Sequence, residues 1–346
     1  MKKTCIAIIG LMFSAACFFV ACKPDPAIIP SKDISFDIPP GWPQPFYNFE
    51  NNTLSKNGFE LGRKLFFDPR LSRTNTVSCG TCHQPFSAFA QLDHNVSHGV
   101  EDKIGTRNSP SLFNLNWHTS FFWDGGVNHL EVQPINPIQN PVEMDENFGN
   151  IIVKLSSDAD YKARFTATYG NDSINSQRIL KALAQFMGML VSSNSKYDKY
   201  MRGEAGGNMT EGELRGLAIF KANCAGCHKE PLFSDFSLRN NGLSVTTAND
   251  SGRAIITHSV TDLYKFKVPS LRNLKYSPPY MHDGRFTTLN QVLDHYASGI
   301  QKSATLDPSL AEGIRLSKQE REDLKAFLNT LNDEDFVKDP RFQEVL

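Results

Sequence analysis

Hydrophobic residues recur at helical spacing in several segments of the chain. Segment 58–68 is apolar at positions 59, 61, 65 and 66, which share one helical face. Segment 179–190 has a similar pattern, and we expect its methionines to be core residues. Both segments are therefore predicted to be helices.

Two further helices are predicted from their N-terminal capping signals. Thr210 and Glu213 have the spacing of a capping box, as do Ser317 and Glu320. The second box precedes an apolar stripe of Leu324, Phe327, Leu328 and Leu331. Strand signals are sparse, so the pattern predicts a mostly α fold.

The N-terminus has the pattern of an export signal. Two lysines precede an apolar run from Ile6 to Ala21, which is shorter than the roughly 20 residues of a spanning helix. The run ends in Phe19-Val20-Ala21-Cys22, which is similar to a bacterial lipobox, although Leu is usual where Phe19 stands. We expect an exported protein on the periplasmic side, anchored through lipid on Cys22. A plain signal peptide is the alternative.

Composition shifts divide the remaining chain. Residues 1–21 are the expected signal, and residues 22–50 are rich in proline and predict an extended tether. A polar, glycine-bearing stretch at 192–207 is a plausible connection between an N-terminal domain, 51–190, and a C-terminal domain, 191–346. The length of 346 residues agrees with roughly two domains.

The charge balance restricts the partners. The chain has 36 basic and 37 acidic residues and a net charge of -1. It therefore has no basic surplus with which to neutralise a phosphate backbone, and we expect no nucleic-acid partner.

Two short motifs carry the candidate chemistry. Beyond the expected signal and Cys22, the chain contains two copies of Cys-x-x-Cys-His: Cys79, Cys82 and His83, then Cys224, Cys227 and His228. This is the attachment signature of c-type haem. Two thiols on one turn can reach both vinyl groups of the macrocycle, and the histidine can become an axial ligand of iron. We expect two covalently attached haems, one in each domain.

Other uses of these cysteines fit less well. An exported protein could form two disulfides. Thioredoxin-like sites share Cys-x-x-Cys but do not require a histidine after both copies. A zinc site favours pairs about 15 to 20 residues apart, whereas Cys82 and Cys224 are 142 positions apart (224 minus 82).

From Gly58 to Leu331 the chain resembles the bacterial dihaem cytochrome c peroxidase family, which includes MauG-type members. The resemblance rests on the two haem motifs and on these segments: Leu65-Phe66-Phe67-Asp68-Pro69-Arg70-Leu71-Ser72, Gly105-Thr106-Arg107-Asn108-Ser109-Pro110-Ser111-Leu112, Phe121-Phe122-Trp123-Asp124-Gly125, Asn140-Pro141-Val142-Glu143-Met144, Val268-Pro269-Ser270-Leu271-Arg272-Asn273 and Tyr280-Met281-His282-Asp283-Gly284. It implies two cytochrome c-like domains with calcium between them.

The resemblance also implies roles for individual residues. Trp123 matches a tryptophan that relays electrons between the haems. Gln133 and Glu143 match a polar pair at the peroxidatic haem, where a carboxylate can shuttle a proton during cleavage of the peroxide O–O bond. Outside the family context, Trp123 could be a core aromatic and Glu143 a surface carboxylate.

Several ligands are implied in the same way. His98 lies in the loop that in many relatives carries a removable ligand of the resting peroxidatic iron, although the sequence around it departs slightly from the family pattern. Calcium ligands are implied, largely through backbone carbonyls, at Asn108, Ser277 and Pro279. Oxygen donors of this kind suit calcium.

The largest departure from conventional peroxidases concerns the second haem. Where those enzymes have a methionine ligand, this chain has Tyr296, as MauG-type members do. A phenolate donor stabilises ferric iron and lowers its potential. Met281 is the alternative ligand, and His282 is expected to hydrogen-bond haem propionates.

Three functions remain open. The first is reduction of hydrogen peroxide to water at the His83 haem, with electrons from a small cytochrome or cupredoxin entering through the His228 haem. The second is MauG-like, peroxide-dependent oxidation of a partner protein. The third is electron transport without turnover, against which Gln133 and Glu143 argue. A homodimer is compatible with each.

Overall fold

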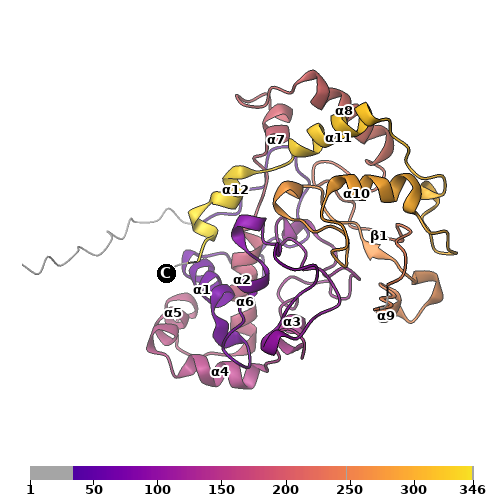
Figure 1. Cartoon of the computed structure of the whole chain (residues 1–346). Coiled ribbons are helices and arrows are strands. Elements are labelled where there is room, and N and C mark those ends of the chain that lie inside the picture. The colour runs from indigo at the N-terminus through magenta and orange to yellow at the C-terminus, as the bar shows by residue number, and fades with distance from the viewer. Residues whose placement is uncertain (1–33, 247, 345–346) are drawn as a thin grey trace, which may run out of the picture. The chain divides into compact units, whose positions relative to one another are not determined.

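The computed structural model describes residues 34–246 and 248–344, which fold mainly into helices (Figure 1). The first helices are α1 (Lys56–Phe67), α2 (Cys79–Cys82), α3 (Ile135–Gln139), α4 (Phe148–Ser156), α5 (Ala159–Tyr169) and α6 (Ser176–Gly188). They are followed by α7 (Lys196–Met201), α8 (Glu211–Asn223), α9 (Ala254–Thr257), α10 (Leu289–Asp294), α11 (Lys318–Asn329) and α12 (Glu334–Lys338). The expected signal peptide and Cys22 lie outside the described residues.

Strand structure is minimal, which confirms the prediction of a mostly α fold. In the described ranges the only sheet joins β1 (Leu238–Arg239) and β2 (Phe266–Lys267). The strands are antiparallel, with Leu238 opposite Lys267 and Arg239 opposite Phe266. None of the helices in this part of the chain is both long and apolar enough to cross a membrane.

The predicted helix starts are confirmed at both capping boxes. The Glu213 amide donates to Thr210 Oγ1 at 3.3 Å, and the Thr210 amide donates to Glu213 Oε2 at 2.6 Å. Ser317 and Glu320 exchange the same pair of bonds at the start of α11. Each reciprocal pair satisfies amides that would otherwise lack partners at a helix start.

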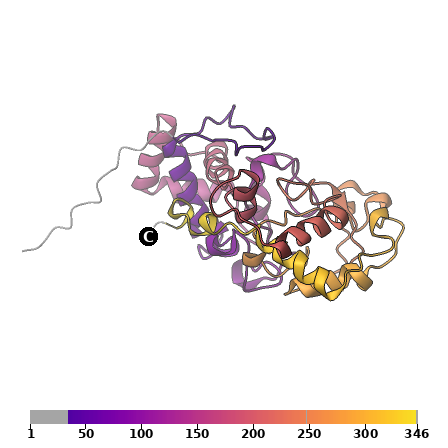
Figure 2. The same cartoon turned by 90° about the horizontal axis from the view of Figure 1, so that it is seen from above.

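Two helix pairs, α1 with α6 and α8 with α11, organise the molecule, and α8 and α11 lie side by side in both ribbon views (Figures 1 and 2). Each pair contains a triangle of phenylalanine rings, and in the first pair Phe59 and Phe67 also pack on one member of the triangle. In the first pair, Phe186 lies 5.1 Å from Phe66 and 6.3 Å from Phe89 between ring centres. In the second, the corresponding distances from Phe327 to Phe220 and Phe233 are 5.1 and 6.2 Å.

Two of the hydrophobic clusters in the described residues surround these helix pairs. The first includes Phe59, Leu61, Leu65, Phe66, Ile179, Leu183 and Phe186. The second includes Tyr197, Leu217, Phe220, Phe233, Leu324, Phe327 and Leu331. The end of the chain returns to the first cluster through Phe336, Val337 and Phe342, which a division at residue 190 does not anticipate.

Residues 34–50 differ from the expected extended tether, because they pack against the folded body. Phe49 is buried, and Phe36 lies 5.8 Å from Trp117 between ring centres. Trp42 meets Trp117 edge-on at 4.9 Å. The aromatic residues set between the prolines supply apolar surface that a solvated tether would expose.

One ion pair is fully enclosed between the connecting segment and the C-terminal half. Arg272 donates to both carboxylate oxygens of Asp198, at 2.7 and 2.8 Å, and its side chain has no exposed area. Its guanidinium also lies 4.8 Å above the Trp42 ring. Because Asp198 is in α7, the pair ties α7 to the segment that follows β2.

Candidate haem sites

The first Cys-x-x-Cys-His motif forms a single helical turn. Cys79 and Cys82 are the ends of α2, and His83 follows directly. The imidazole Nδ1 of His83 lies 2.8 Å from the carbonyl oxygen of Phe89. Since a carbonyl can only accept, Nδ1 carries the proton, and Nε2 keeps its lone pair for a metal.

The second motif repeats this arrangement at the end of α8. His228 Nδ1 lies 3.2 Å from the Phe233 carbonyl oxygen and 3.1 Å from that of Pro269. Burial lowers the pKa of His228, and it lowers that of His83 to about 4. Both imidazoles are therefore neutral near pH 7, with Nε2 available as a ligand.

The four thiols are unpaired, so the described structure contains neither of the two possible disulfides. Burial raises the pKa of Cys79 and of Cys224 to about 12 and that of Cys82 to about 11. Redox-active cysteines of the thioredoxin kind instead have a lowered pKa. In the described ranges no three His, Cys, Asp or Glu side chains gather into a metal site.

These observations fit covalent c-type haem. Each site combines two free thiols on one turn with a neutral histidine whose orientation a backbone carbonyl fixes. Cys79, Cys82 and His83 would hold one haem, and Cys224, Cys227 and His228 the other.

Glu143 lies beside the first site. Its charge helps to raise the pKa of both Cys79 and Cys82, after burial, the main cause. Burial raises the pKa of Glu143 itself, against a hydrogen bond that Asn140 Nδ2 donates to Oε1 at 2.8 Å. The Glu143 carbonyl accepts from the Val100 amide at 2.8 Å, so the backbone of this residue is fixed.

Gly99 makes this close approach possible. A Cβ atom at position 99 would lie 2.3 Å from the carbonyl oxygens of both Val142 and Glu143. The loop that carries His98 can therefore lie directly on the segment that carries Glu143 only because residue 99 has no side chain.

The two other residues expected near this site have different surroundings. Gln133 is half-buried in the turn before α3, and its side chain makes no hydrogen bond within the described residues. The His98 ring stacks on that of His94 at 4.0 Å, and the His98 carbonyl lies 3.6 Å from Cys82 Sγ. The loop is thus at the first site, while its imidazole faces His94.

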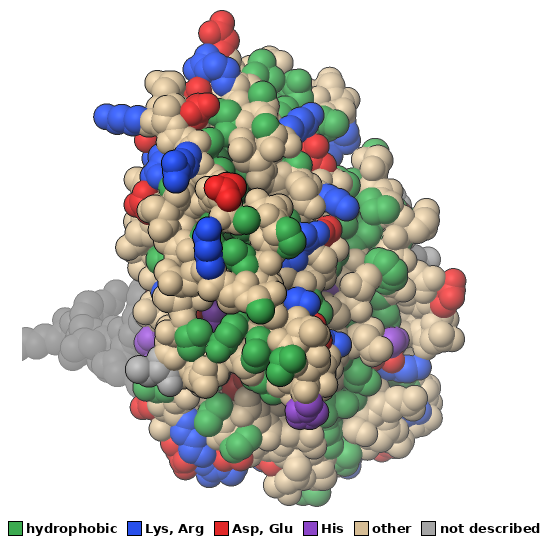
Figure 3. Space-filling view, turned by 90° about the vertical axis from the view of Figure 1, so that its right-hand side faces the viewer, with side chains coloured by type: hydrophobic (Ala, Val, Ile, Leu, Met, Phe, Trp, Pro, Cys, Tyr) green, Lys and Arg blue, Asp and Glu red, His purple; other side chains and the backbone are tan. Residues whose placement is uncertain are grey.

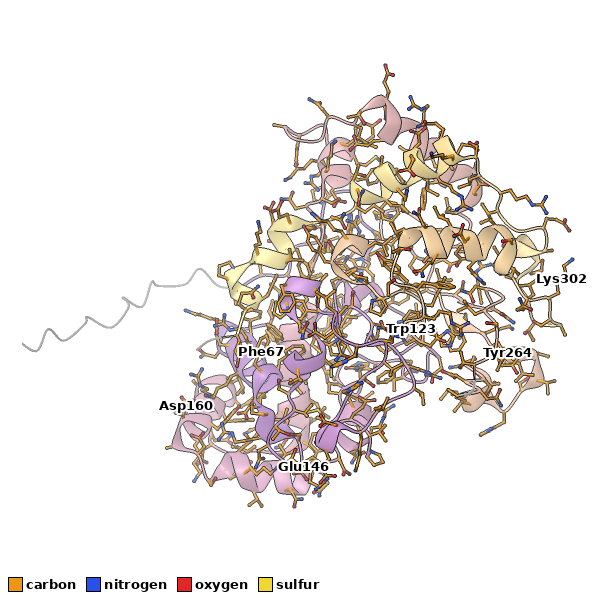
Figure 4. All side chains as sticks on the ribbon, viewed as in Figure 1. Phe67, Trp123, Glu146, Asp160, Tyr264 and Lys302 are labelled. Carbon is orange, nitrogen blue, oxygen red and sulfur yellow. The ribbon has the colours of Figure 1, made fainter. Side chains whose placement is uncertain are left out.

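Trp123 joins the two halves of the described chain (Figure 4). Its indole Nε1 donates to the Asn108 carbonyl at 2.9 Å, and its own carbonyl accepts from the Lys267 amide at 2.6 Å. Its ring lies 6.5 Å from that of His282, which stacks on Phe266 at 3.7 Å. The contacts of Trp123 therefore come from segments before and after the connecting stretch.

Tyr296 lies beside the second thiol pair, in a π-helical turn, His295–Gly299, that follows α10. Burial raises the pKa of Tyr296, and a hydrogen bond with Asn241 lowers it. The charges of Cys224 and Cys227 raise this pKa further. Met281 is close as well, because Asn241 Nδ2 lies 3.6 Å from its Sδ. Both expected alternatives for the second haem thus contact one amide side chain.

The expected calcium residues lie on two neighbouring segments. The Asn108 amide donates to the His282 carbonyl at 2.7 Å, which brings Asn108 beside the segment that contains Ser277 and Pro279. The Asn108 carbonyl already accepts from Trp123.

Two polar groups near these sites carry no recognisable signal in the sequence. Asn241 has no motif of its own. Lys267 places Nζ 3.1 Å from His118 Nδ1 and 2.9 Å from the Ser120 carbonyl. The sequence also does not indicate the contacts of Arg107, which belongs to the segment Gly105–Leu112. Its guanidinium donates to Asp124 at 2.5 Å and to Asp250 at 2.6 Å.

Comparison with known proteins identifies the family. A family model described as di-haem cytochrome c peroxidase matches residues 56–206. The methylamine utilization protein MauG of Methylorubrum extorquens is 38% identical over 289 residues, which cover 82% of this chain and 80% of that protein. The chain belongs to the di-haem cytochrome c peroxidase family, as its motifs predict. It is therefore an oxidoreductase enzyme, and this membership implies two c-type haems.

Two further relatives agree. A cytochrome c551 peroxidase of Nitrosomonas europaea is 36% identical, over 68% of this di-haem peroxidase and 71% of the relative. A crystal structure of a MauG-like protein associated with microbial copper homeostasis matches with a TM-score of 0.83 and 33% identity, covering 90% of this chain and 99% of that one.

Proposed function

We propose that this di-haem peroxidase reduces hydrogen peroxide to water at the Cys79–His83 site, with electrons that a small donor protein delivers at the Cys224–His228 site. The observation that carries the proposal is the asymmetry of the two sites. A buried carboxyl group, Glu143, lies beside the first thiol pair, whereas a phenol, Tyr296, lies beside the second. The carboxylates near the second thiol pair, Asp235 and Asp307, are both ion-paired with Arg239, whereas Glu143 has no cationic partner within the described residues.

The residues of the first site would transfer a proton between the two oxygens of peroxide. Haem bound by His83 would supply the iron and the electrons needed to cleave the O–O bond. Oε1 of Glu143 accepts a hydrogen bond from Asn140, whereas Oε2 accepts none from the described residues. Oε2 would therefore take a proton from one peroxide oxygen and return it to the other. The raised pKa of Glu143 suits a group that must alternate between both protonation states. Gln133 would orient peroxide without a change in charge.

Two cytochrome c-like domains, 51–190 and 191–346, are supported by the repeated construction. Each helix pair encloses the same triangle of phenylalanine rings, and one ring of each triangle belongs to the residue whose carbonyl orients the haem histidine. Trp123 would relay electrons between the domains, which its contacts with Asn108 and Lys267 favour. We also propose a calcium ion with ligands at Asn108, Ser277 and Pro279. His98 would be a removable ligand of the resting peroxidatic iron.

A protein donor is supported by exposed apolar side chains near Trp123. Ile255, Ile256 and Val260 are 49%, 43% and 76% exposed. The first two belong to α9, which lies on the right of Figure 1, the side that faces the viewer in Figure 3. Arg253, just before α9, donates to the carbonyls of Asp124 and Gly125, which follow Trp123. Export and a lipid anchor on Cys22 would place the enzyme at the periplasmic side of a membrane.

MauG-like oxidation of a partner protein is the second candidate. It is favoured by Tyr296 beside the second thiol pair and by the similarity to MauG. Steady-state peroxide consumption by the holoprotein distinguishes the two. Rapid turnover with a reduced small cytochrome c or cupredoxin, exceeding that with artificial donors, is expected for the peroxidase. Absence of turnover with any protein donor would contradict it.

A further inference from the structure

Asn241 makes two kinds of contact at the second haem site. Its backbone carbonyl lies 3.0 Å from Nε2 of His295, the first residue of the π-helical turn that carries Tyr296. The carbonyl of the next residue, Gly242, accepts a hydrogen bond from the Gln301 amide at 2.7 Å. The backbone therefore fixes this loop against the turn and leaves the Asn241 side chain free for other contacts.

That side chain is directed at both candidate ligands. Asn241 Nδ2 lies 3.6 Å from Met281 Sδ, and a hydrogen bond from the same amide opposes the rise that burial causes in the pKa of the Tyr296 hydroxyl. An amide NH₂ group has two N–H donors, one for each partner. Both ligand atoms are acceptors in these bonds.

The positions of the two ligands are fixed independently of the amide. The Tyr296 carbonyl accepts from the Ile314 amide at 2.7 Å. Met281 has a φ of 74°, in the left-handed region that residues with a side chain rarely adopt. The Met281 carbonyl accepts from the Gly284 amide at 3.2 Å, and the neighbouring Tyr280 amide bonds to Phe286. The backbones of both residues are thus held in place beside Asn241.

We propose that Asn241 is a positioning residue that selects Tyr296 over Met281 as the ligand of the second haem. An N–H donated to the phenol oxygen stabilises negative charge there, which favours oxygen as a ligand. An N–H donated to the thioether uses one of the two lone pairs of sulfur and so makes it a weaker ligand of iron. The two bonds act in the same direction. This inference rests on the proposed haem at Cys224, Cys227 and His228.

The test is the absorption spectrum and reduction potential of the resting ferric holoprotein. In the parent we expect oxygen ligation and no red charge-transfer band of the histidine–methionine type. Asn241→Leu keeps the side-chain size but removes both donors. We expect this variant to gain the methionine-type band and to shift the second haem to a more positive potential. Asn241→Leu combined with Met281→Leu should show neither change.

A matched control separates the amide from the loop. Asn240 is the preceding residue, and its amide bonds to Ser303 and Thr305 instead of to the candidate ligands. Asn240→Ala should keep the parent ligand spectrum. The proposal is wrong if Asn241→Leu retains the parent spectrum and potential, if the parent already has the methionine band, or if Asn240→Ala shifts as Asn241→Leu does.

These outcomes are independent of the proposed peroxidase activity. If the parent holoprotein turns over peroxide and Asn241→Leu has the parent spectrum, only the proposed role of Asn241 is wrong. If Asn241→Leu gains the methionine-type band but the parent holoprotein does not turn over peroxide, only the proposed peroxidase activity is wrong.

Discussion

Gly62 of α1 lies directly against the backbone of Ala182 in α6: a Cβ atom at position 62 would lie 1.9 Å from the Ala182 carbonyl oxygen. Gly216 of α8 repeats this relationship with Asp323 of α11, again at 1.9 Å. In each pair a phenylalanine four residues later on the second helix, Phe186 or Phe327, is the next nearest neighbour. Because these phenylalanines belong to the two ring triangles, the glycines set the helix spacing around each candidate haem site.

The first prediction tests this contact. Gly216→Ala should destabilise the protein by about 1–3 kcal/mol, because overpacking against a backbone atom outweighs the gain of roughly 1 kcal/mol in helix propensity. Gly212→Ala in the same helix is the control, because its Cβ would meet only side-chain ends at 3.3 Å or more. Denaturant unfolding should find Gly212→Ala unchanged or stabilised. Equal stability of both variants would contradict the tight contact.

The second prediction concerns Glu143. Glu143→Gln should retain both haems but lower peroxide turnover by about 10²- to 10⁴-fold, because the amide preserves packing and cannot shuttle a proton. Glu101→Gln is the control, since Glu101 is an exposed carboxylate paired with Arg73. It should keep the parent rate. Parent-level turnover in Glu143→Gln would remove Glu143 as the acid–base group.

The third prediction concerns the buried pair of Asp198 and Arg272. Asp198→Asn should lower the free energy of unfolding by about 3–5 kcal/mol, because it leaves the enclosed guanidinium without a counter-charge. Glu334→Gln, which breaks the exposed pair with Lys338, should cost at most about 1 kcal/mol. Chemical denaturation of both variants measures the difference. Similar small losses would mean that water reaches Arg272.

Local spacing explains which parts of the sites were predictable. The haem motifs and capping boxes are defined by residues within four positions of each other, so the sequence alone identifies them. Asn241 meets Met281 40 positions later, and Lys267 meets His118 across 149 positions. Those contacts depend on how the loops pack, for which a single sequence has no periodic signal. Residues 34–50 were misjudged because prolines suggested extension, while the aromatic residues between them determined the packing.

The last prediction concerns pH and Lys267. Burial lowers the pKa of this lysine to about 7, against the charge of Asp124, which raises it. Its amine is enclosed by His118, Ser120 and the Phe121 ring, and within the described residues it pairs with no carboxylate. In the unfolded chain its pKa returns to the ordinary value near 10.5. Between these values the unfolded state binds one proton more than the folded state, so stability rises with pH.

Lys267→Met should remove this component of the pH dependence. From about pH 7 to pH 9 the parent should gain stability relative to the variant by up to about 1.4 kcal/mol per pH unit, the value for one proton. Denaturant unfolding curves at several pH values measure that slope. Lys265→Met is the control, because the Lys265 amine is partly exposed and paired with Asp262. If the parent and Lys267→Met have parallel pH profiles, the amine is protonated in the folded protein and a counter-charge must reach it.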